Sequence, residues 1–304
     1  MNEVSINDIL HSNKFLNKKV SISGWVKTFR ANRFIALNDG SGLDNLQCVI
    51  DFENTDDEIL KSISTGASIN VSGSLVSSQG SKQNVELKVD SCKILGDSNP
   101  ETYPIQPKKH SFEFLRENAH LRTRTNTFGA VMRIRSNLSF AIHQYFKNNG
   151  FYYVHTPIIT ASDAEGAGEQ FRVSTLDMKN PPKDDNGKID YKKDFFGKET
   201  NLTVSGQLEA EAYAMSMGKV YTFGPTFRAE NSNTSRHLSE FWMIEPEVAF
   251  MDINGNMKLA EDFLKYILSY IVNNNIEDLK FLENRLISEE KQKPQNERSE
   301  LTLI

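Results

Sequence analysis

Five short runs between Lys18 and Leu95 alternate apolar with polar residues. Alternation with period two is typical of β-strands that bury one face. The breaks NDGSG and SSQGSK supply the Asn, Asp, Gly and Ser residues that tight turns require. The apolar positions of the runs are Val20 and Ile22; Ile35 and Leu37; Leu46, Cys48 and Ile50; Ile69, Val71 and Leu75; and Val85, Leu87 and Val89. This region predicts a small closed barrel of five strands, with the nucleic-acid-binding OB-type barrel favoured, and an SH3-like barrel or a small sandwich fits nearly as well.

The sequence changes character at residues 97–110, where three prolines interrupt regular strands and favour extended backbone. Beyond this linker, apolar residues at spacings of three and four predict amphipathic helices from Phe128 to Tyr145 and from about Met257 to Asn273. Strand-like runs lie between the two helices. Because helices and strands mix without a βαβ rhythm, an α+β fold is favoured over a doubly wound sheet. The expected divisions are a barrel domain over 1–100, a hinge over 101–125 and a second domain over 126–304.

The composition excludes some classes of function. A net charge of -5 over 304 residues argues against general adhesion to nucleic acid or to an anionic membrane, so any nucleic-acid site must be local. No apolar run approaches the roughly 20 residues of a membrane-spanning helix, and the first residues lack the pattern of a signal peptide. We therefore expect a cytoplasmic protein with no membrane partner. Cys48 and Cys92 have no second Cys or His at metal-ligand spacing, so we expect reduced packing residues and no metal site within this chain.

The stretch FRAENSNTSRHLSEF concentrates charge beside apolar, strand-like runs. Arg228 and Glu230 are two residues apart, so on a strand both point to the same face. An arginine fork matches a phosphate or carboxylate, and a glutamate accepts from an amino group. Arg236 and His237 add two groups suited to polyphosphate, and Phe241 offers an aromatic face for a base. By composition alone, a surface hairpin with a solvated charge cluster is the favoured explanation.

The same stretch resembles motif 2 of the class II aminoacyl-tRNA synthetases, in which two antiparallel strands and their loop hold ATP. The resemblance implies that Arg228 bridges the α-phosphate of ATP and the amino-acid carboxylate, and that Glu230 meets the adenine amino group. It further implies that Arg236 and His237 bind the phosphates and that Phe241 stacks on adenine. Arg228 and His237 are accordingly expected to be catalytic, because prearranged cations stabilise the charge that accumulates when a carboxylate attacks a phosphate.

A second stretch, GFYYVHTPIIT, resembles motif 1 of the same family, with Gly150, Val154 and Pro157 at the expected positions. In that family, motif 1 forms the homodimer interface, so the resemblance implies a homodimer through the region Gly150–Thr160. An N-terminal barrel followed by such a core is the arrangement of the aspartate, asparagine and lysine enzymes. The implied fold is therefore an anticodon-binding barrel followed by a class II core, an antiparallel sheet flanked by helices.

Two further segments resemble the amino-acid site of the family. SDAEGAGEQF resembles the mobile loop that closes over the substrate, which implies that Glu165 binds the α-ammonium group. LTVSGQLEAE resembles the segment that holds the amino acid, which implies binding roles for Ser205 and Gln207. Without the resemblance, the first segment is an ordinary flexible loop and the second is the start of an amphipathic helix with exposed glutamates.

Position 210 bears on which amino acid is bound. Family members specific for aspartate carry a lysine there, which pairs with the side-chain carboxylate, whereas this chain has Ala210. A neutral amide needs no cation, and an aspartate carboxylate would be left unpaired. Glu211 resembles the carboxylate that accepts from the asparagine amide, and Glu209 is a weaker candidate. The resemblance, which includes a polar surface insertion at 180–199, is to the bacterial asparagine-specific branch and implies asparagine and tRNA(Asn) as partners.

The barrel offers candidate RNA-binding residues. Phe34 and Gln47 match the anticodon readers of the family, in which an aromatic ring stacks on an unpaired base and an amide reads its edge. Trp25, Lys27 and Arg30 would complete a basic aromatic face. Lone aromatic residues in barrels are usually core residues, and that interpretation stays open.

The resemblance ends at Leu301. The motif 3 of the family, which carries the second ATP arginine, is absent, since no GxGxxR-like string occurs in the chain. We therefore expect a piece of a longer polypeptide, or a shortened product, that uses ATP and Mg²⁺, with the Mg²⁺ ligands beyond residue 304. The hypothesis is ligation of asparagine to its tRNA through an asparaginyl adenylate, with this chain inactive alone. A non-discriminating aspartate enzyme and a catalytically incomplete tRNA-binding fragment are the alternatives.

Overall fold

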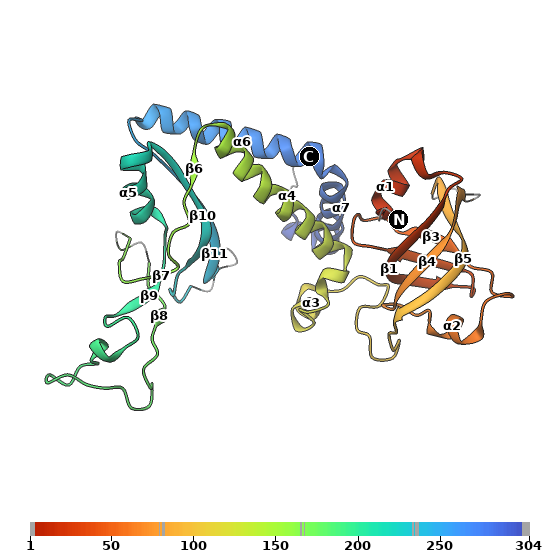
Figure 1. The fold of residues 1–304 in the computed structure, drawn as a ribbon, viewed down its shortest axis with the longest axis horizontal. Coiled ribbons are helices and arrows are strands. Elements are labelled where there is room, and N and C mark those ends of the chain that lie inside the picture. The colour runs from red at the N-terminus through yellow and green to blue at the C-terminus, as the bar shows by residue number, and fades with distance from the viewer. Residues whose placement is uncertain are drawn as a thin grey trace. The chain divides into compact units, whose positions relative to one another are not determined.

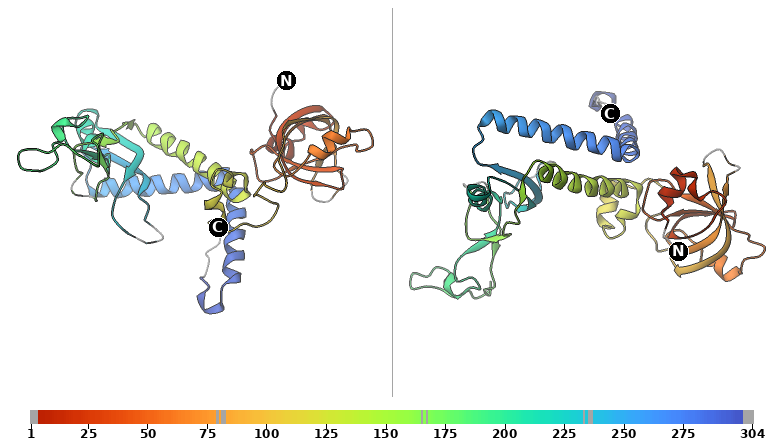
Figure 2. Two further views of the ribbon diagram at one scale, coloured as in Figure 1. Left: turned by 90° about the horizontal axis from the view of Figure 1, so that it is seen from below. Right: turned by 45° about the horizontal axis from the view of Figure 1, so that its top comes forward.

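The structure is a computed structural model, shown in Figures 1 and 2, and it describes residues 4–78, 80, 83–164, 166, 168–232, 234 and 237–299. The chain divides into two compact units. The first contains the chain up to Asn137 and again from Ile271 onward, and the second is Leu138–Tyr270. The domain boundaries expected at residues 100 and 125 stay predictions.

The first unit contains a closed barrel with strand order β1-β2-β3-β5-β4, seen nearly end-on in the left view of Figure 2. The predicted apolar positions line its core. In β4, a shift of register at Gly73 brings two backbones together, so that an added Cβ would lie 2.0 Å from the Lys88 carbonyl oxygen. The predicted five-stranded barrel is confirmed. Its strands are β1 (Lys19–Arg30), β2 (Phe34–Asn38), β3 (Leu46–Val49), β4 (Ser68–Ser77) and β5 (Val85–Gly96).

Short helices cover the barrel. Helix α1 (Ile6–His11) starts at Ser5, whose hydroxyl accepts from the Asp8 backbone N–H, and it buries Ile6 and Ile9 in the barrel core. Two other short helical segments are η1 (Asn13–Phe15) and α2 (Asp57–Ser62).

The rest of the first unit is helical. Arg133 of α4 binds Asp278 of α7 bidentately, with Nη2 to Oδ1 at 2.6 Å and Nε to Oδ2 at 3.1 Å. Our sequence analysis did not predict α7, whose surface is highly charged, although Ile276, Leu279 and Leu282 recur at helical spacing. The elements are α3 (Phe112–Glu117), η2 (Arg122–Arg124), the start of α4 (Asn126–Asn148), α7 (Ile276–Gln292) and η4 (Gln295–Glu297).

The second unit is built on a sheet with strand order β11-β10-β6. The strands β10 (Lys219–Phe227) and β11 (Glu240–Val248) are antiparallel, and β6 (Tyr152–Tyr153) runs parallel to β10. The C-terminal part of α4 and helix α6 (Ile253–Asn274) pack on one face around Phe146 and Tyr221. On the opposite face, helix α5 (Gln207–Met217) packs through Ala210 and Ala214 against Val220 of β10 (Figure 1). The predicted α+β mixture is confirmed.

A smaller sheet in the same unit has the order β7-β9-β8. Its strands are β7 (Ile159–Thr160), β8 (Arg172–Val173) and β9 (Thr200–Leu202). The segment between β8 and β9, which includes η3 (Tyr191–Lys193) and the predicted insertion, projects beyond this sheet (Figure 1). Among the described helices of the whole chain, none has the length and apolar character to cross a bilayer.

Candidate active site

Arg228 and Phe241 lie together at the loop end of the β10–β11 hairpin. Phe241 is opposite Thr226 in the ladder, and the Arg228 backbone N–H extends the ladder by donating to Ser239 O at 3.0 Å. The guanidinium carbon of Arg228 is 5.4 Å from the centroid of the Phe241 ring. The antiparallel register therefore brings together two residues that the sequence separates by thirteen positions.

The Arg228 guanidinium has unused donors. Its Nε is buried and has no hydrogen-bond partner among the described residues, and its Nη2 contacts the Met243 sulfur at 4.0 Å. A buried donor of a charged group is unfavourable without an acceptor. The position therefore suits a phosphate or carboxylate group of a ligand.

Gly168 and Glu169, from the segment SDAEGAGEQF, lie against Arg228, Ala229 and Glu230. The Ala229 backbone N–H donates to Glu169 O at 2.7 Å. At Gly168 an added Cβ would lie 2.6 Å from Glu230 Oε1 and 3.3 Å from Arg228 Cδ. A larger residue at position 168 would therefore displace the Glu230 side chain. Glu165, predicted in the same loop, lies outside the described residues.

The remaining predicted phosphate ligands lie in the loop between β10 and β11. His237 is exposed, and its Nδ1 is hydrogen-bonded to Thr234 Oγ1. Glu230 is also exposed. Arg236 lies outside the part of the chain that the structure describes.

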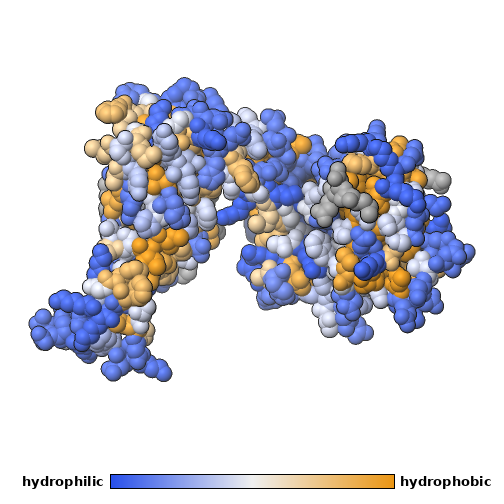
Figure 3. Space-filling model, viewed as in Figure 1, coloured by the Kyte–Doolittle hydropathy of each residue, from blue (hydrophilic) through white to orange (hydrophobic). Residues whose placement is uncertain are grey.

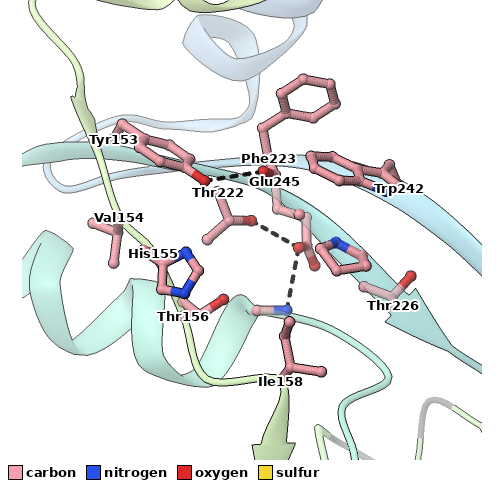
Figure 4. A pocket seen from close by; sticks show the side chains of 13 residues that line it. Tyr153, Val154, His155, Thr156, Ile158, Thr222, Phe223, Thr226, Trp242 and Glu245 are labelled. Carbon is pink, nitrogen blue, oxygen red and sulfur yellow. Dashed lines mark hydrogen bonds between the residues drawn. The ribbon is translucent and has the colours of Figure 1, made fainter. Parts of the chain in front are cut away.

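A single carboxylate, that of Glu245, fixes the start of α5 to the sheet. Its Oε1 accepts from the Ser205 hydroxyl. Its Oε2 accepts from the Gly206 backbone N–H at 3.2 Å and from Thr222 Oγ1 at 2.8 Å (Figure 4). The Ser205 hydroxyl in turn accepts from the Gln207 backbone N–H at 3.0 Å. Sequence analysis missed Glu245, although it stands two residues from Met243 and four from Phe241 on one face of β11.

Further carboxylates gather beside this point. Gln207 Nε2 donates to Glu211 Oε1 at 2.8 Å. Burial raises the pKa of Glu247, and the negative charges of Glu211 and Glu245 raise it further. Ala210 is fully buried among Val154, Ala214 and Val220 and offers no polar group to this surface. The cluster of Glu211, Glu245 and Glu247 therefore suits N–H donors such as an amide or an ammonium group.

Glu245 also reaches the wall of a pocket of about 140 Å³ (Figure 4). One side is formed by the segment after β6, including His155 and Thr156, and the other by β10 and by Trp242 of β11. The hydroxyl of Tyr153 donates to Phe223 O at 3.2 Å across its edge. The segment resembling motif 1 thus lies beside the strands resembling motif 2.

The five predicted RNA-binding residues lie on the adjacent strands β1, β2 and β3 of the barrel. Trp25 and Lys27 meet Arg124, whose guanidinium carbon is 5.6 Å from the Trp25 ring and whose carbonyl accepts from Lys27 Nζ at 2.6 Å. Burial, and then the charges of Arg124 and Arg133, lower the pKa of Lys27.

The other three predicted residues are Phe34, Gln47 and Arg30. Arg30 pairs with Phe34 in the β1–β2 ladder, and Phe34 is half-buried. Gln47 lies on neighbouring β3, and its Nε2 donates to Glu86 Oε2 at 3.1 Å. Trp25 and Lys27 thus contact Arg124, whereas Gln47 contacts Glu86.

Comparison with known protein families decides what these units are. Residues 111–299 match the family described as tRNA synthetases class II (D, K and N), and residues 20–95 match the OB-fold nucleic acid binding domain. The chain belongs to the class II tRNA synthetases of this group. The family expected from the motif 1 and motif 2 resemblances, and the OB-type barrel, are confirmed.

Curated members of the class II family are similar over most of this chain. The asparagine–tRNA ligase of Cytophaga hutchinsonii is 56% identical over 286 residues, which are 93% of this chain and 62% of that protein. The asparagine–tRNA ligase of Parabacteroides distasonis is 58% identical over 278 residues, which are 90% of this chain and 59% of that protein. The chain thus spans about three fifths of the length of these class II synthetases.

Solved class II synthetases share the fold. The asparaginyl-tRNA synthetase of Pyrococcus horikoshii complexed with asparaginyl-adenylate has a TM-score of 0.76 at 24% identity, over 92% of this chain and 61% of that one. A putative aspartyl-tRNA synthetase of Leishmania major has a TM-score of 0.71 at 21% identity, over 92% of this chain and 53% of that one. Because both amino-acid specificities share the fold, the choice between them depends on side chains.

Proposed function

We propose that this protein ligates asparagine to tRNA(Asn) in two steps, through an asparaginyl adenylate made from asparagine and ATP. The observation that carries the proposal is the order of side chains on one face of β11, which is Phe241, Met243, Glu245 and Glu247. At one end of this face, Phe241 and Arg228 form an aromatic and cationic region. About 13 Å along the strand, Glu245 begins an acidic region at the other end. An aminoacyl adenylate has the same polarity, with base and phosphate at one end and amino-acid nitrogen groups at the other.

Positioning and electrostatics supply the chemistry in this proposal. Attack of the asparagine carboxylate on the α-phosphate brings two anions together, and the unpartnered donors of Arg228 offset that charge. Glu230 and Phe241 orient the adenine, and His237 and Arg236 bind the terminal phosphates. Bound Mg²⁺ would neutralise phosphate charge, and its ligands are proposed to lie beyond residue 304. No protein nucleophile is required.

The acidic end favours asparagine over aspartate. The carboxylates of Glu211 and Glu247 would repel an aspartate side chain but accept from an amide N–H. Ala210 supplies no cation for aspartate. The similarity of 56–58% to proteins named asparagine–tRNA ligase supports the same choice. In this proposal Ser205 and Gln207 hold the substrate together with Glu165.

The other expected partners are part of the proposal. The OB-type barrel is proposed to bind the anticodon, with Phe34 stacking on a base and Gln47 reading its edge, and Trp25, Lys27 and Arg30 extending the contact. Residues Gly150–Thr160 are proposed to form a homodimer interface, which the exposure of Tyr152 (57%) and Ile159 (41%) supports. The location is proposed to be cytoplasmic.

The test is asparagine-dependent exchange of labelled pyrophosphate into ATP. It is run on this chain and on a longer form extended to the length of its relatives, with aspartate as control. Exchange by the longer form with asparagine only is the expected result. Exchange with aspartate and not asparagine would replace the proposal with an aspartate enzyme, and tRNA binding without any exchange would leave only an RNA-binding protein.

A further inference from the structure

The segment between β8 and β9 exposes two adjacent aromatic rings. Phe195 is 75% exposed and Phe196 is 47% exposed, and the two rings pack edge to face with centroids 4.8 Å apart. In Figure 3 the tip of the projecting segment is hydrophilic, and apolar atoms gather nearer to the small sheet. Adjacent large apolar side chains in water are unfavourable unless another molecule covers them.

Asp194 holds these rings in a fixed place. Its carboxylate is buried and accepts from Ser174 Oγ at 2.7 Å, from the Thr175 backbone N–H and Oγ1 at 2.9 Å, and from the Phe195 backbone N–H at 2.8 Å. These hydrogen bonds hold the pKa of Asp194 well below its usual range. Gly197, at φ 67°, donates its backbone N–H to Asp194 O at 3.0 Å and closes the turn. The rings are therefore presented by a hydrogen-bonded platform.

Lysines lie on both sides of the two rings, in a segment that carries five lysines and five carboxylates between positions 180 and 199. The run YKKDFFGK (191–198) contains three lysines and one carboxylate, the buried Asp194. Lys192 and Lys198 are exposed and form no ion pair with any described carboxylate, while Lys193 lies 3.8 Å from Asp190. Tyr191 is covered by Arg172, whose guanidinium carbon is 5.4 Å from its ring. Exposed phenylalanines flanked by lysines are suited to binding unpaired nucleotides, by stacking on the bases and by attraction to phosphate.

We propose that Phe195 and Phe196, with Lys192 and Lys198, form an RNA-binding site for unpaired bases, and that this site holds the single-stranded 3′ end of the substrate tRNA. The inference rests on the proposed function, because the aminoacyl group is transferred to that end and the platform lies in the same unit as Arg228. A protein surface is the alternative occupant, but the unpaired lysines favour a polyanion.

The test uses the longer form of the protein and a tRNA(Asn) transcript, either intact or trimmed of its unpaired 3′ nucleotides. The double variant F195A/F196A is expected to bind the intact transcript about tenfold more weakly and to bind both transcripts equally. The double variant K192Q/K198Q is expected to lower the slope of log Kd against log salt by about 1.4. Phe250→Ala, which removes a fully exposed ring of the same unit in the turn between β11 and α6, is the matched control and should change neither the affinity nor the salt slope.

Pyrophosphate exchange separates this inference from the proposed function, because it requires no RNA. Normal exchange by F195A/F196A together with weakened binding of only the intact transcript supports the inference. Normal exchange with unchanged tRNA affinity overturns it and leaves the proposed function standing. Equally weakened binding of the intact and the trimmed transcript also overturns it. Loss of self-association in sedimentation, with RNA affinity unchanged, overturns it in favour of a protein surface as the occupant. Absence of both exchange and tRNA binding in the parent protein overturns the two together.

Discussion

The Thr222 hydroxyl donates a hydrogen bond of 2.8 Å to Glu245 directly across the ladder between β10 and β11. The same carboxylate also accepts from Ser205 and from the Gly206 backbone N–H. One side chain of the sheet therefore sets the position of the start of α5, the helix that carries Gln207 and Glu211. The geometry of the proposed amide site depends on this relationship.

Glu245→Gln should destabilise the second unit by about 1–3 kcal/mol, because an amide cannot accept from three donors at these positions. Denaturation by urea, followed by circular dichroism, measures the change. Glu240→Gln, at an exposed position of the same strand, is the control and should change stability by less than about 0.5 kcal/mol. Equal stability of the two variants would contradict the role of Glu245.

Arg228→Lys should lower the rate of asparagine-dependent exchange by about 10²–10³-fold in the longer form. A lysine keeps the positive charge but loses the planar fork that binds two oxygens at once, and single preorganised donors are typically worth this factor. The unfolding temperature should stay unchanged, because Nε of Arg228 makes no internal hydrogen bond with the described residues. A variant that retains at least half of the parent rate would remove Arg228 from the proposed mechanism.

Gly168→Ala should weaken ATP binding with little effect on stability. The new Cβ would lie 2.6 Å from Glu230 Oε1, which is the end of a flexible side chain that can move aside. Moving Glu230 displaces the group proposed to meet adenine, so KM for ATP should rise about tenfold, the effect of losing about 1.4 kcal/mol. Gly224→Ala, where an added Cβ meets no atom within 4 Å, should leave KM unchanged.

Glu247→Gln should raise the unfolding temperature at pH 7. Burial and the charges of Glu211 and Glu245 raise the pKa of Glu247 above its usual 4.5, so the folded chain holds this proton more tightly than the unfolded chain. The contribution of Glu247 to the free energy of unfolding therefore falls as pH rises from 4.5 through the pKa of the folded state. The difference in unfolding temperature between Glu247→Gln and the parent should vanish at pH 4.5 and below, where the glutamate is protonated in both states.

Glu261→Gln serves as the control of opposite sign for this pH prediction. The hydrogen bond from Lys265 lowers the pKa of Glu261, so its neutral variant should lose stability above pH 4.5. Unfolding temperatures measured from pH 4 to pH 8 compare the two. A lower unfolding temperature of Glu247→Gln at pH 7 would contradict the proposed repulsion.

Asp278→Ala should destabilise the first unit by about 3 kcal/mol or more, because it leaves the guanidinium of Arg133 partly buried without its partner. Thermal unfolding measures the change. Glu277→Ala removes the adjacent carboxylate, whose ion pair with Lys280 is exposed, and should have an effect below about 1 kcal/mol. Similar losses in the two variants would show that the bidentate pair contributes little.

The sequence by itself determined the barrel, the α+β second unit and the hairpin that carries Arg228 and Phe241. These features depend on local spacing, because period-two runs must bury one face and a hairpin must align residues on either side of its loop. The family was predicted from the resemblances to motif 1 and motif 2, and the match over residues 111–299 confirmed it.

Only the tertiary structure decided which side chains share a site. It joined Ser205 and Thr222 through Glu245, placed Arg124 over Trp25, and turned Asp194 inward beside two exposed rings. Each outcome depends on register between distant strands or on burial, and one residue of register shift would turn every side chain of a strand to the opposite face. Such contacts are not contained in any local pattern of residues, because they form only when the elements pack.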